Sequence, residues 1–161
     1  MKAADFDRLY EELAPGLFSF LVYRTGDRTL AEDLVADTFE RVYRARRRFD
    51  RRKASEKTWI YSIALNRLRD QARRSQTEER TLAKLGGGAG EAPGSLDAVY
   101  ERDLVLQAMA ALSDEERQAI SLRYGGDMTV PEIAKLTGEP LTTVEGRVYR
   151  ALRKMRDALS A

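Results

Sequence analysis

Cysteine and histidine are both absent from the 161 residues of this chain. Their absence excludes a disulfide, a Ser-His or Cys-His nucleophile pair, an imidazole acid-base group and a zinc site of the Cys/His type. Only carboxylate, Lys, Tyr or Ser chemistry remains. Many classes of enzyme are thus excluded, and on this basis, together with the patterns described below, we expect a protein that is not an enzyme and that needs no metal and no cofactor.

Long apolar runs are absent as well. No segment approaches the ~18 apolar residues of a membrane span, and the N-terminal sequence MKAADFDRLYEE becomes acidic where a signal peptide has its apolar core. We expect a soluble, cytoplasmic chain with no membrane insertion.

The net charge of +2 conceals an uneven distribution. Residues 41–74 carry 13 basic and 3 acidic side chains, whereas residues 1–40 and residues 75–122 each carry 4 basic and 9 acidic ones. Residues 123–161 carry 7 basic and 5 acidic side chains. A strongly basic stretch between two acidic ones indicates a polyanionic partner that only part of the chain contacts.

Glycine marks the main boundary in the chain. The segment KLGGGAGEAPGS contains 5 of the 11 glycines and disfavours both helix and strand. It predicts a flexible linker over residues 76–96, between two small domains at residues 1–75 and residues 97–161.

Both domains have helical patterns, since apolar residues recur at three- and four-residue spacing. Capping boxes indicate helix starts at Thr29, Ser113, Thr129 and Thr142. The Pro15-Gly16 pair predicts a kink or a break in the first helix. The fold class is therefore all-α, with helices expected over residues 4–24, 29–47, 56–74, 97–111, 114–124, 130–137 and 142–159.

The segment TVPEIAKLTGEPLTTVEGRVYRALRKMRDAL has a helix-turn-helix pattern, with a short helix that ends at Gly138 and a long second helix. The second helix has a basic face with one aromatic, Tyr149, which suits the major groove of DNA. A solvated amphipathic helix is the simpler alternative, and Glu145 would repel phosphate although it fits a capping box. The apolar stripe opposite consists of Val144, Val148, Ala151, Leu152, Met155 and Leu159.

In the N-terminal domain, the helix expected over residues 29–47 has two faces. Its predicted core side consists of Leu34, Val35, Thr38, Phe39 and Val42. Asp33, Asp37 and Glu40 lie opposite and form what we call the acidic face. A solvated surface is the simplest interpretation of these acids, but the acidic face could also bind a basic partner.

A basic stretch, RARRRFDRRKASEK, follows and leads into the next helix. One side of that helix, here called the Trp59 face, carries Trp59, Ser62, Asn66, Arg69 and Arg73. The inward side is predicted to carry Ile60, Ala64, Leu65, Leu68 and Ala72. Aromatic, amide and guanidinium groups together suit unpaired bases and their backbone. A single tryptophan is more often a core anchor, so Trp59 alone decides little.

Three blocks of the sequence resemble the extracytoplasmic-function (ECF) sigma factors, the smallest members of the sigma-70 superfamily of bacterial transcription initiation factors. AEDLVADTFERVYRARRRF resembles their regions 2.2 and 2.3, TWIYSIALNRLRDQARR resembles region 2.4, and the stretch from ALSDEERQAI to RKMRDAL resembles region 4. The resemblance implies sigma region 2 in residues 1–75 and region 4 in residues 97–161. It also implies binding to core RNA polymerase and to promoter DNA.

The resemblance further implies three sites and one more partner. Contact with the clamp helices of the polymerase β′ subunit is implied for Asp33, Leu34, Asp37, Thr38 and Glu40. Reading of the -10 element as a single strand is implied for Arg47, Arg48, Phe49, Arg51, Arg52, Lys53, Ser55, Lys57, Trp59, Ser62, Asn66, Arg69 and Arg73. Reading of the -35 element as duplex is implied for Thr142, Thr143, Glu145, Gly146, Arg147, Tyr149, Arg150, Arg153 and Lys154. Region 4 of the family also touches the polymerase β flap, and many relatives are held inactive by an anti-sigma factor.

The sequence departs from the family pattern at Ala36, where the family often has Gln, at Glu145, where many relatives are basic, and at the residue after Trp59. Housekeeping sigma factors have an aromatic pair where this chain has Trp59 followed by Ile60. One ring fewer implies weaker strand separation and a stricter promoter requirement.

Two other functions compete with this interpretation. A stand-alone helix-turn-helix regulator would need a dimer and a palindromic site, because one such motif reads too few bases. A metal-dependent nuclease would need convergent carboxylates, whereas the acidic residues here are predicted on exposed helix faces.

Overall fold

The computed structural model describes the backbone of residues 1–85 and 100–160 and the side chains of residues 1–81 and 104–160. The described elements are α1 (Ala3–Thr25), α2 (Arg28–Ala45), the 3-10 turn η1 (Arg46–Arg48), α3 (Glu56–Leu85), α4 (Tyr100–Ala110), α5 (Asp114–Ile120), the π-helix η2 (Ser121–Gly125), α6 (Val130–Thr137) and α7 (Leu141–Ser160). The all-α prediction is confirmed. Among the described helices, none combines the length and the apolar character needed to cross a membrane.

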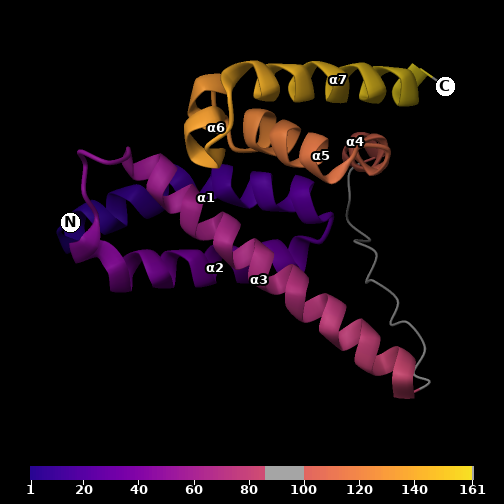
Figure 1. Ribbon diagram of the computed structural model, residues 1–161. Helices are drawn as coiled ribbons and strands as arrows, with labels where there is room; N and C mark the ends of the chain where they lie inside the picture. Colours follow the sequence, from indigo (N-terminus) through magenta and orange to yellow (C-terminus); the bar gives the residue numbers. More distant parts are fainter. Residues whose placement is uncertain (86–99, 161) are drawn as a thin grey trace.

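The helices form two groups. The first consists of α1, α2 and α3, and in the second α7 lies across α4 and α5 with α6 at one end (Figure 1). Apolar spacing explains the first group, since α2 buries Ala31, Leu34, Thr38 and Val42 at successive turns of one face. This face packs toward α1 and α3.

The two groups pack against each other, because α1 contacts η2 and α3 contacts α6. Gly125 lies so close to Phe20 that a Cβ added to it would be 2.9 Å from the Phe20 Cα. Tyr61 is buried at the same junction, and its hydroxyl donates to the Gly126 carbonyl at 3.5 Å. Burial raises the pKa of Tyr61, so this hydroxyl keeps its proton. Buried residues of both groups form one hydrophobic cluster.

Several helix boundaries differ from the sequence-based expectation. The helix predicted over residues 56–74 runs on to Leu85, because no glycine or proline interrupts good helix formers before Gly86. Residues 76–85 of the predicted linker are therefore helical, whereas residues 86–96 lie outside the described residues. The helix predicted over residues 97–111 is described from Tyr100 to Ala110, and the one predicted over residues 114–124 changes to a π-helix at Ser121.

Two of the four predicted capping boxes are confirmed, at Ser113 and Thr129. The predicted box at Thr29 is wrong: Asp27 caps α2 instead, and its carboxylate accepts the N–H of Leu30. The predicted start at Thr142 is also displaced, since α7 begins at Leu141 after Pro140 and Thr142 lies within the first turn.

Proline does not break the first helix. Pro15 lies inside α1, which is continuous from Ala3 to Thr25. A proline removes one backbone hydrogen bond of the helix, but Leu17, Phe20 and Leu21 on the following turns are fully buried. This burial holds the second half of α1 in place.

Candidate nucleic-acid interface

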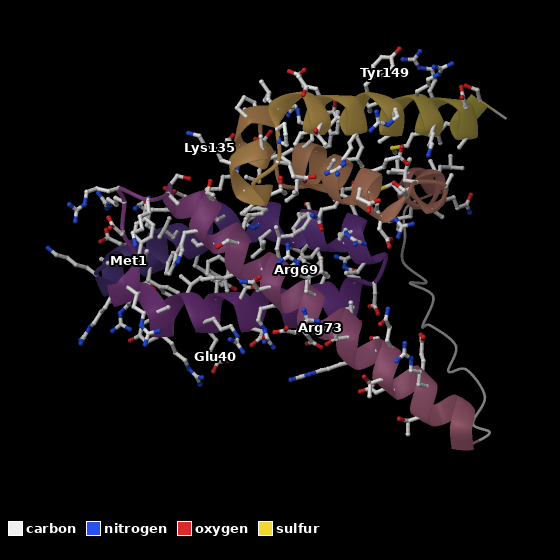
Figure 2. The ribbon with its side chains drawn as sticks, in the orientation of Figure 1. Met1, Glu40, Arg69, Arg73, Lys135 and Tyr149 are labelled. Atoms are coloured by element: carbon white, nitrogen blue, oxygen red, sulfur yellow. The ribbon has the colours of Figure 1, made fainter. Side chains whose placement is uncertain are left out.

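The acidic face lies on the side of α2 that is turned away from the second group of helices. Asp33 and Glu40 are exposed, and Glu40 points away from the core in Figure 2. Leu34 and Thr38 are buried, and the Thr38 hydroxyl donates to the Leu34 carbonyl at 2.6 Å. Their implied polymerase contact does not match this placement, because both side chains support the helix from within the core.

Asp37 differs from the other two acids because it is tied to α3. Its carboxylate accepts a hydrogen bond from Nε of Arg67, and Arg41 Nε lies 4.0 Å away on its own helix. Glu40 pairs only with Arg44, one turn along α2. Asp33 has no ion pair with any described residue. The acidic face thus contains one carboxylate bound to another helix, one paired within α2, and one, Asp33, with no ion pair among the described residues.

The loop between α2 and α3 displays its cations to solvent. Asp50 shapes this loop by accepting the Arg52 N–H at 2.9 Å on its carboxylate and the Lys53 N–H at 3.0 Å on its carbonyl. Arg46 donates to the Tyr43 carbonyl at 2.7 Å. Among the remaining cations of residues 46–53, no ion pair within the described residues engages Arg47, Arg48, Arg51 or Lys53. Together these free cations form a surface for an anion.

The Trp59 face joins this loop to α3. The Phe49 and Trp59 rings lie 4.9 Å apart at an interplanar angle of 39°. Trp59 is half-buried, packing against the core on one side and reaching the surface on the other. Asn66 is exposed and accepts from Arg69 at 3.4 Å, and Figure 2 shows Arg69 and Arg73 farther along α3.

Three further residues predicted to read the -10 element make hydrogen bonds within the chain. Ser55 caps α3, because its hydroxyl accepts the N–H of Thr58 at 3.1 Å. The Ser62 hydroxyl donates to the carbonyl of Trp59. Lys57 donates its Nζ to the Asp127 carbonyl at 2.9 Å and so links α3 to the second group. On the opposite side of α3, Ile60, Ala64 and Leu65 are buried as predicted, but Ala72 is exposed because α2 does not reach it.

The outer face of α7 is open to solvent. Tyr149 is 68% exposed and points away from α5 in Figure 2. Arg150 and Arg153 are exposed on the same side, and the Arg150 guanidinium folds over Gly146. The buried stripe is narrower than predicted: Val144, Val148 and Ala151 are buried and Met155 is partly buried, whereas Leu152 and Leu159 are exposed.

The start of α7 carries the remaining residues implied for the -35 element. Thr142 and Glu145 are exposed, and Thr143 is partly exposed. Arg147 is held by Glu139 of the preceding turn. The α6 to α7 turn thus fixes one of the predicted DNA-contacting cations in place.

Most of the residues that line a groove between α2 and α3 were not predicted from the sequence. Arg41, Arg44, Ile63 and Arg67 line this groove together with Arg48 and Asn66. The spacing of Arg41, Arg44 and Arg48, at i, i+3 and i+7, is the signal that could have placed them on one side of α2. Arg67 carries no comparable signal, because its partner Asp37 is remote in sequence.

Lys154 has a structural partner. Its Nζ donates to the buried carboxylate of Glu116 at 2.7 Å, across α5 and α7. The hydrogen bond from Lys154, followed by the one from the Ser113 amide, lowers the pKa of Glu116 below its ordinary value of 4.5. A carboxyl group whose pKa is depressed on folding stabilises the fold above its unfolded pKa, and this stabilisation is lost as the pH falls through the folded pKa.

We therefore expect Lys154→Met to lower the free energy of unfolding at pH 7, since it leaves a buried carboxylate without its cation. The difference from the unsubstituted chain should shrink as the pH falls below about 4.5, where Glu116 becomes protonated in the variant and in the unfolded chains. Denaturant titrations from pH 7 to pH 3 measure it. Arg153→Met, which removes an exposed and unpaired cation, is the control. A Lys154→Met difference that stays constant over this range contradicts the prediction.

Two segments of the chain match known protein families. Residues 9–78 match sigma-70 region 2, and residues 102–155 match sigma-70 region 4. The chain is 32% identical to the ECF RNA polymerase sigma factor RpoE of Cereibacter sphaeroides, over 98% of this chain and 87% of that relative. The chain belongs to the ECF sigma factors. It is also 26% identical to the ECF RNA polymerase sigma factor SigK of Mycobacterium tuberculosis, over 97% of this chain and 86% of SigK.

Two solved structures have the same fold. The sigma factor RpoE from Bartonella quintana, solved in complex with the anti-sigma factor NepR, superposes with a TM-score of 0.79 at 24% identity, over 98% of both chains. CnrH, solved in complex with the cytosolic domain of CnrY, superposes with a TM-score of 0.66 at 26% identity, over 99% of this chain and 90% of CnrH.

Membership of this family fixes the general activity. As an ECF sigma factor, the chain is a promoter-specific transcription initiation factor that works with core RNA polymerase. A stand-alone helix-turn-helix regulator is not favoured, because such a regulator has no need of the sigma region 2 that residues 9–78 match.

Proposed function

We propose that this ECF sigma factor divides its contacts among three surfaces. Asp33 and Glu40, with Asp37 beside them, bind a basic surface of core polymerase. The basic loop and the Trp59 face bind the unpaired strand of the -10 element. The start and outer face of α7 bind the -35 element as duplex.

The main support for this proposal is that the basic loop between α2 and α3 contacts α3 at Trp59. Uncompensated cations of residues 46–53 lie beside a half-exposed indole and an exposed amide, Asn66. Cations bind the phosphate backbone, an aromatic ring stacks on a base, and an amide reads a base edge. A surface that served only for solvation would have no reason to combine them.

On α7, the exposed groups suit duplex DNA. Tyr149, Arg150 and Arg153 face solvent with no ion pair among the described residues. A helix of this kind enters the major groove with its first turns, which here carry Thr142, Thr143 and Glu145. Because Arg147 is held by Glu139, we propose that it positions the turn and contacts the DNA backbone only at its free nitrogens.

We also propose that the factor is not itself an enzyme, acts in the cytoplasm together with polymerase, and is regulated by an anti-sigma protein. The uncovered acidic face and the aromatic side chains beside it, Tyr10 and Tyr43, would suit such a regulator. The RpoE and NepR complex, whose sigma factor shares this fold, supports this regulation.

Run-off transcription with purified core polymerase on genomic fragments tests the proposed function. Products should appear from a small set of templates only when the chain is added. Binding of the chain to the same templates without polymerase should be weak, because polymerase fixes the distance between the two DNA-reading surfaces. No product from any template would refute the proposal.

We expect the triple substitution of Arg47, Arg48 and Arg51 by alanine to weaken promoter binding by the holoenzyme and to reduce its salt dependence. The slope of log K against log salt should become shallower by about 0.7 for each phosphate of the unpaired strand that the variant no longer binds. A salt titration of promoter binding measures this slope. Arg8→Ala, which removes a cation that Glu12 and Glu56 already neutralise, is the control. A triple variant with the same slope as Arg8→Ala contradicts the prediction.

A further inference from the structure

Arg67 joins the acidic face of α2 to the Trp59 face of α3. Its side chain is only 13% exposed, its Nε donates to the Asp37 carboxylate, and its Nη1 donates to Asp70 at 3.1 Å. Such a shielded pair interacts more strongly than one in open solvent. Among the described residues, Asp37 is the only member of the acidic face that is bound to another helix.

The same guanidinium lines a cavity of about 380 Å³ between α2 and α3. The cavity is lined by Arg41, Arg44, Ala45, Arg48, Ile63, Asn66, Arg67 and Asp70. Four guanidinium groups and one carboxylate line it, and the positive charge still exceeds the negative charge when the ion-pair partners Asp37 and Glu40 are included, which suits the phosphate of a nucleic-acid strand. Arg67 directly follows Asn66, for which we propose a base contact.

We propose that Arg67 is a cation shared between two anions. In the free chain Asp37 holds it, and when a basic surface of polymerase binds Asp37, Arg67 is released to a phosphate of the unpaired promoter strand in this cavity. The inference rests on the proposed function, since it assigns the regulation of the same two surfaces. Arg67 acts as a positioning residue while Asp37 holds it and as a DNA contact once it is released.

The exchange links the two binding events. When Asp37 faces a polymerase cation, its carboxylate binds Arg67 less tightly. Polymerase binding therefore raises the affinity of the chain for the DNA strand. By linkage, the DNA strand strengthens polymerase binding by the same factor. This coupling is one physical reason for a factor to bind its promoter weakly until polymerase is present.

Asp37→Asn tests the proposal without polymerase, because it removes the charge that holds Arg67. The probe is a fluorescently labelled oligonucleotide of twelve thymidines, titrated with the full chain at low salt. The variant should bind about 3- to 10-fold more tightly than the unsubstituted chain, with a salt slope steeper by about 0.7, the value for one more phosphate contact on a single strand. Glu32→Gln is the matched control, since it removes an exposed acid from the same helix without touching Arg67.

A second pair of variants separates release of Arg67 from a general change in charge. In the Arg67→Met background, Asp37→Asn should change neither affinity nor slope. Thermal unfolding checks that these chains fold. If Arg67→Met does not fold, Arg67→Lys, which keeps the charge, replaces it. In the Arg67→Lys background, Asp37→Asn should give a smaller gain in affinity than in the unsubstituted chain. A gain that Glu32→Gln reproduces, or that persists in full with Arg67→Met, overturns the proposal. If the unsubstituted chain supports transcription and Asp37→Asn shows no gain in affinity for the oligonucleotide, only this inference fails. Absence of transcription from every template refutes the proposed function instead.

Discussion

Gly125→Ala is expected to lower the free energy of unfolding by about 1–3 kcal/mol, the usual cost of forcing an extra methyl group into a packed contact. The new Cβ would lie 2.9 Å from both the Cα and the backbone nitrogen of Phe20. Because these are backbone atoms within α1, no side-chain rotation can make room. The two groups of helices would have to move apart at the junction of α1 and η2.

Urea titration measures this loss, and small-angle scattering measures the expected increase in radius of gyration. Gly146→Ala is the matched control, since its Cβ meets only the flexible end of Arg150, at 3.0 Å. That substitution should leave stability unchanged or raise it by up to about 1 kcal/mol, because alanine is the better helix former. Equal unfolding curves for Gly125→Ala and the unsubstituted chain would show that the close approach to Phe20 is not required.

The contrast between these two glycines shows what the sequence can and cannot predict. Local patterns correctly predict the helices, because periodic apolar residues and capping boxes act within one or two turns. The capping box at Ser113 and the buried face of α2 are examples. The junction of Gly125 with Phe20 joins residues that are remote in sequence, and no local pattern encodes it.

The candidate site also has features that the sequence predicts and features that depend on contacts remote in sequence. Sequence and resemblance together predicted an exposed outer face for α7 and the exposed cations at Arg47 and Arg51, and both are found. They did not predict that Lys154 and Arg147 would be bound by Glu116 and Glu139, since these pairs depend on how α5 and the turn before α7 meet α7. An unpaired arginine and a paired one look alike in a sequence.

A resemblance to a family assigns contacts to residues without showing whether their side chains are buried. Leu34 and Thr38 belong to the segment that resembles the polymerase-binding region, yet the structure places both in the core. The start of α2 was placed wrongly because the sequence offers two residues that suit an N-cap, Asp27 and Thr29. In the structure α2 uses the aspartate. The structure therefore limits the predicted polymerase-binding surface to those of its residues whose side chains are accessible to a partner.

Trp59 is the partly exposed ring that we propose stacks on a base of the -10 element. Ile60 is fully buried, so in our proposal only the first position of the aromatic pair of housekeeping sigma factors can present a ring to DNA. Phe49 packs against the indole, which remains partly exposed. Trp59→Ala should therefore reduce open-complex formation on duplex promoters about 5- to 150-fold, corresponding to the loss of one base stack worth about 1–3 kcal/mol.

Two comparisons separate stacking from folding in this test. Trp59→Phe keeps a ring and should recover most of the open complex, whereas Trp59→Ala should recover on a template whose -10 element is already unpaired, since the work of strand separation is then removed. A Trp59→Ala chain that is merely misfolded would fail on both templates. Permanganate footprinting of the -10 element measures opening directly. Full opening of duplex promoters by Trp59→Ala would mean that cations of the basic loop hold the separated strand without a stacked base, and Trp59 would then be a core anchor only.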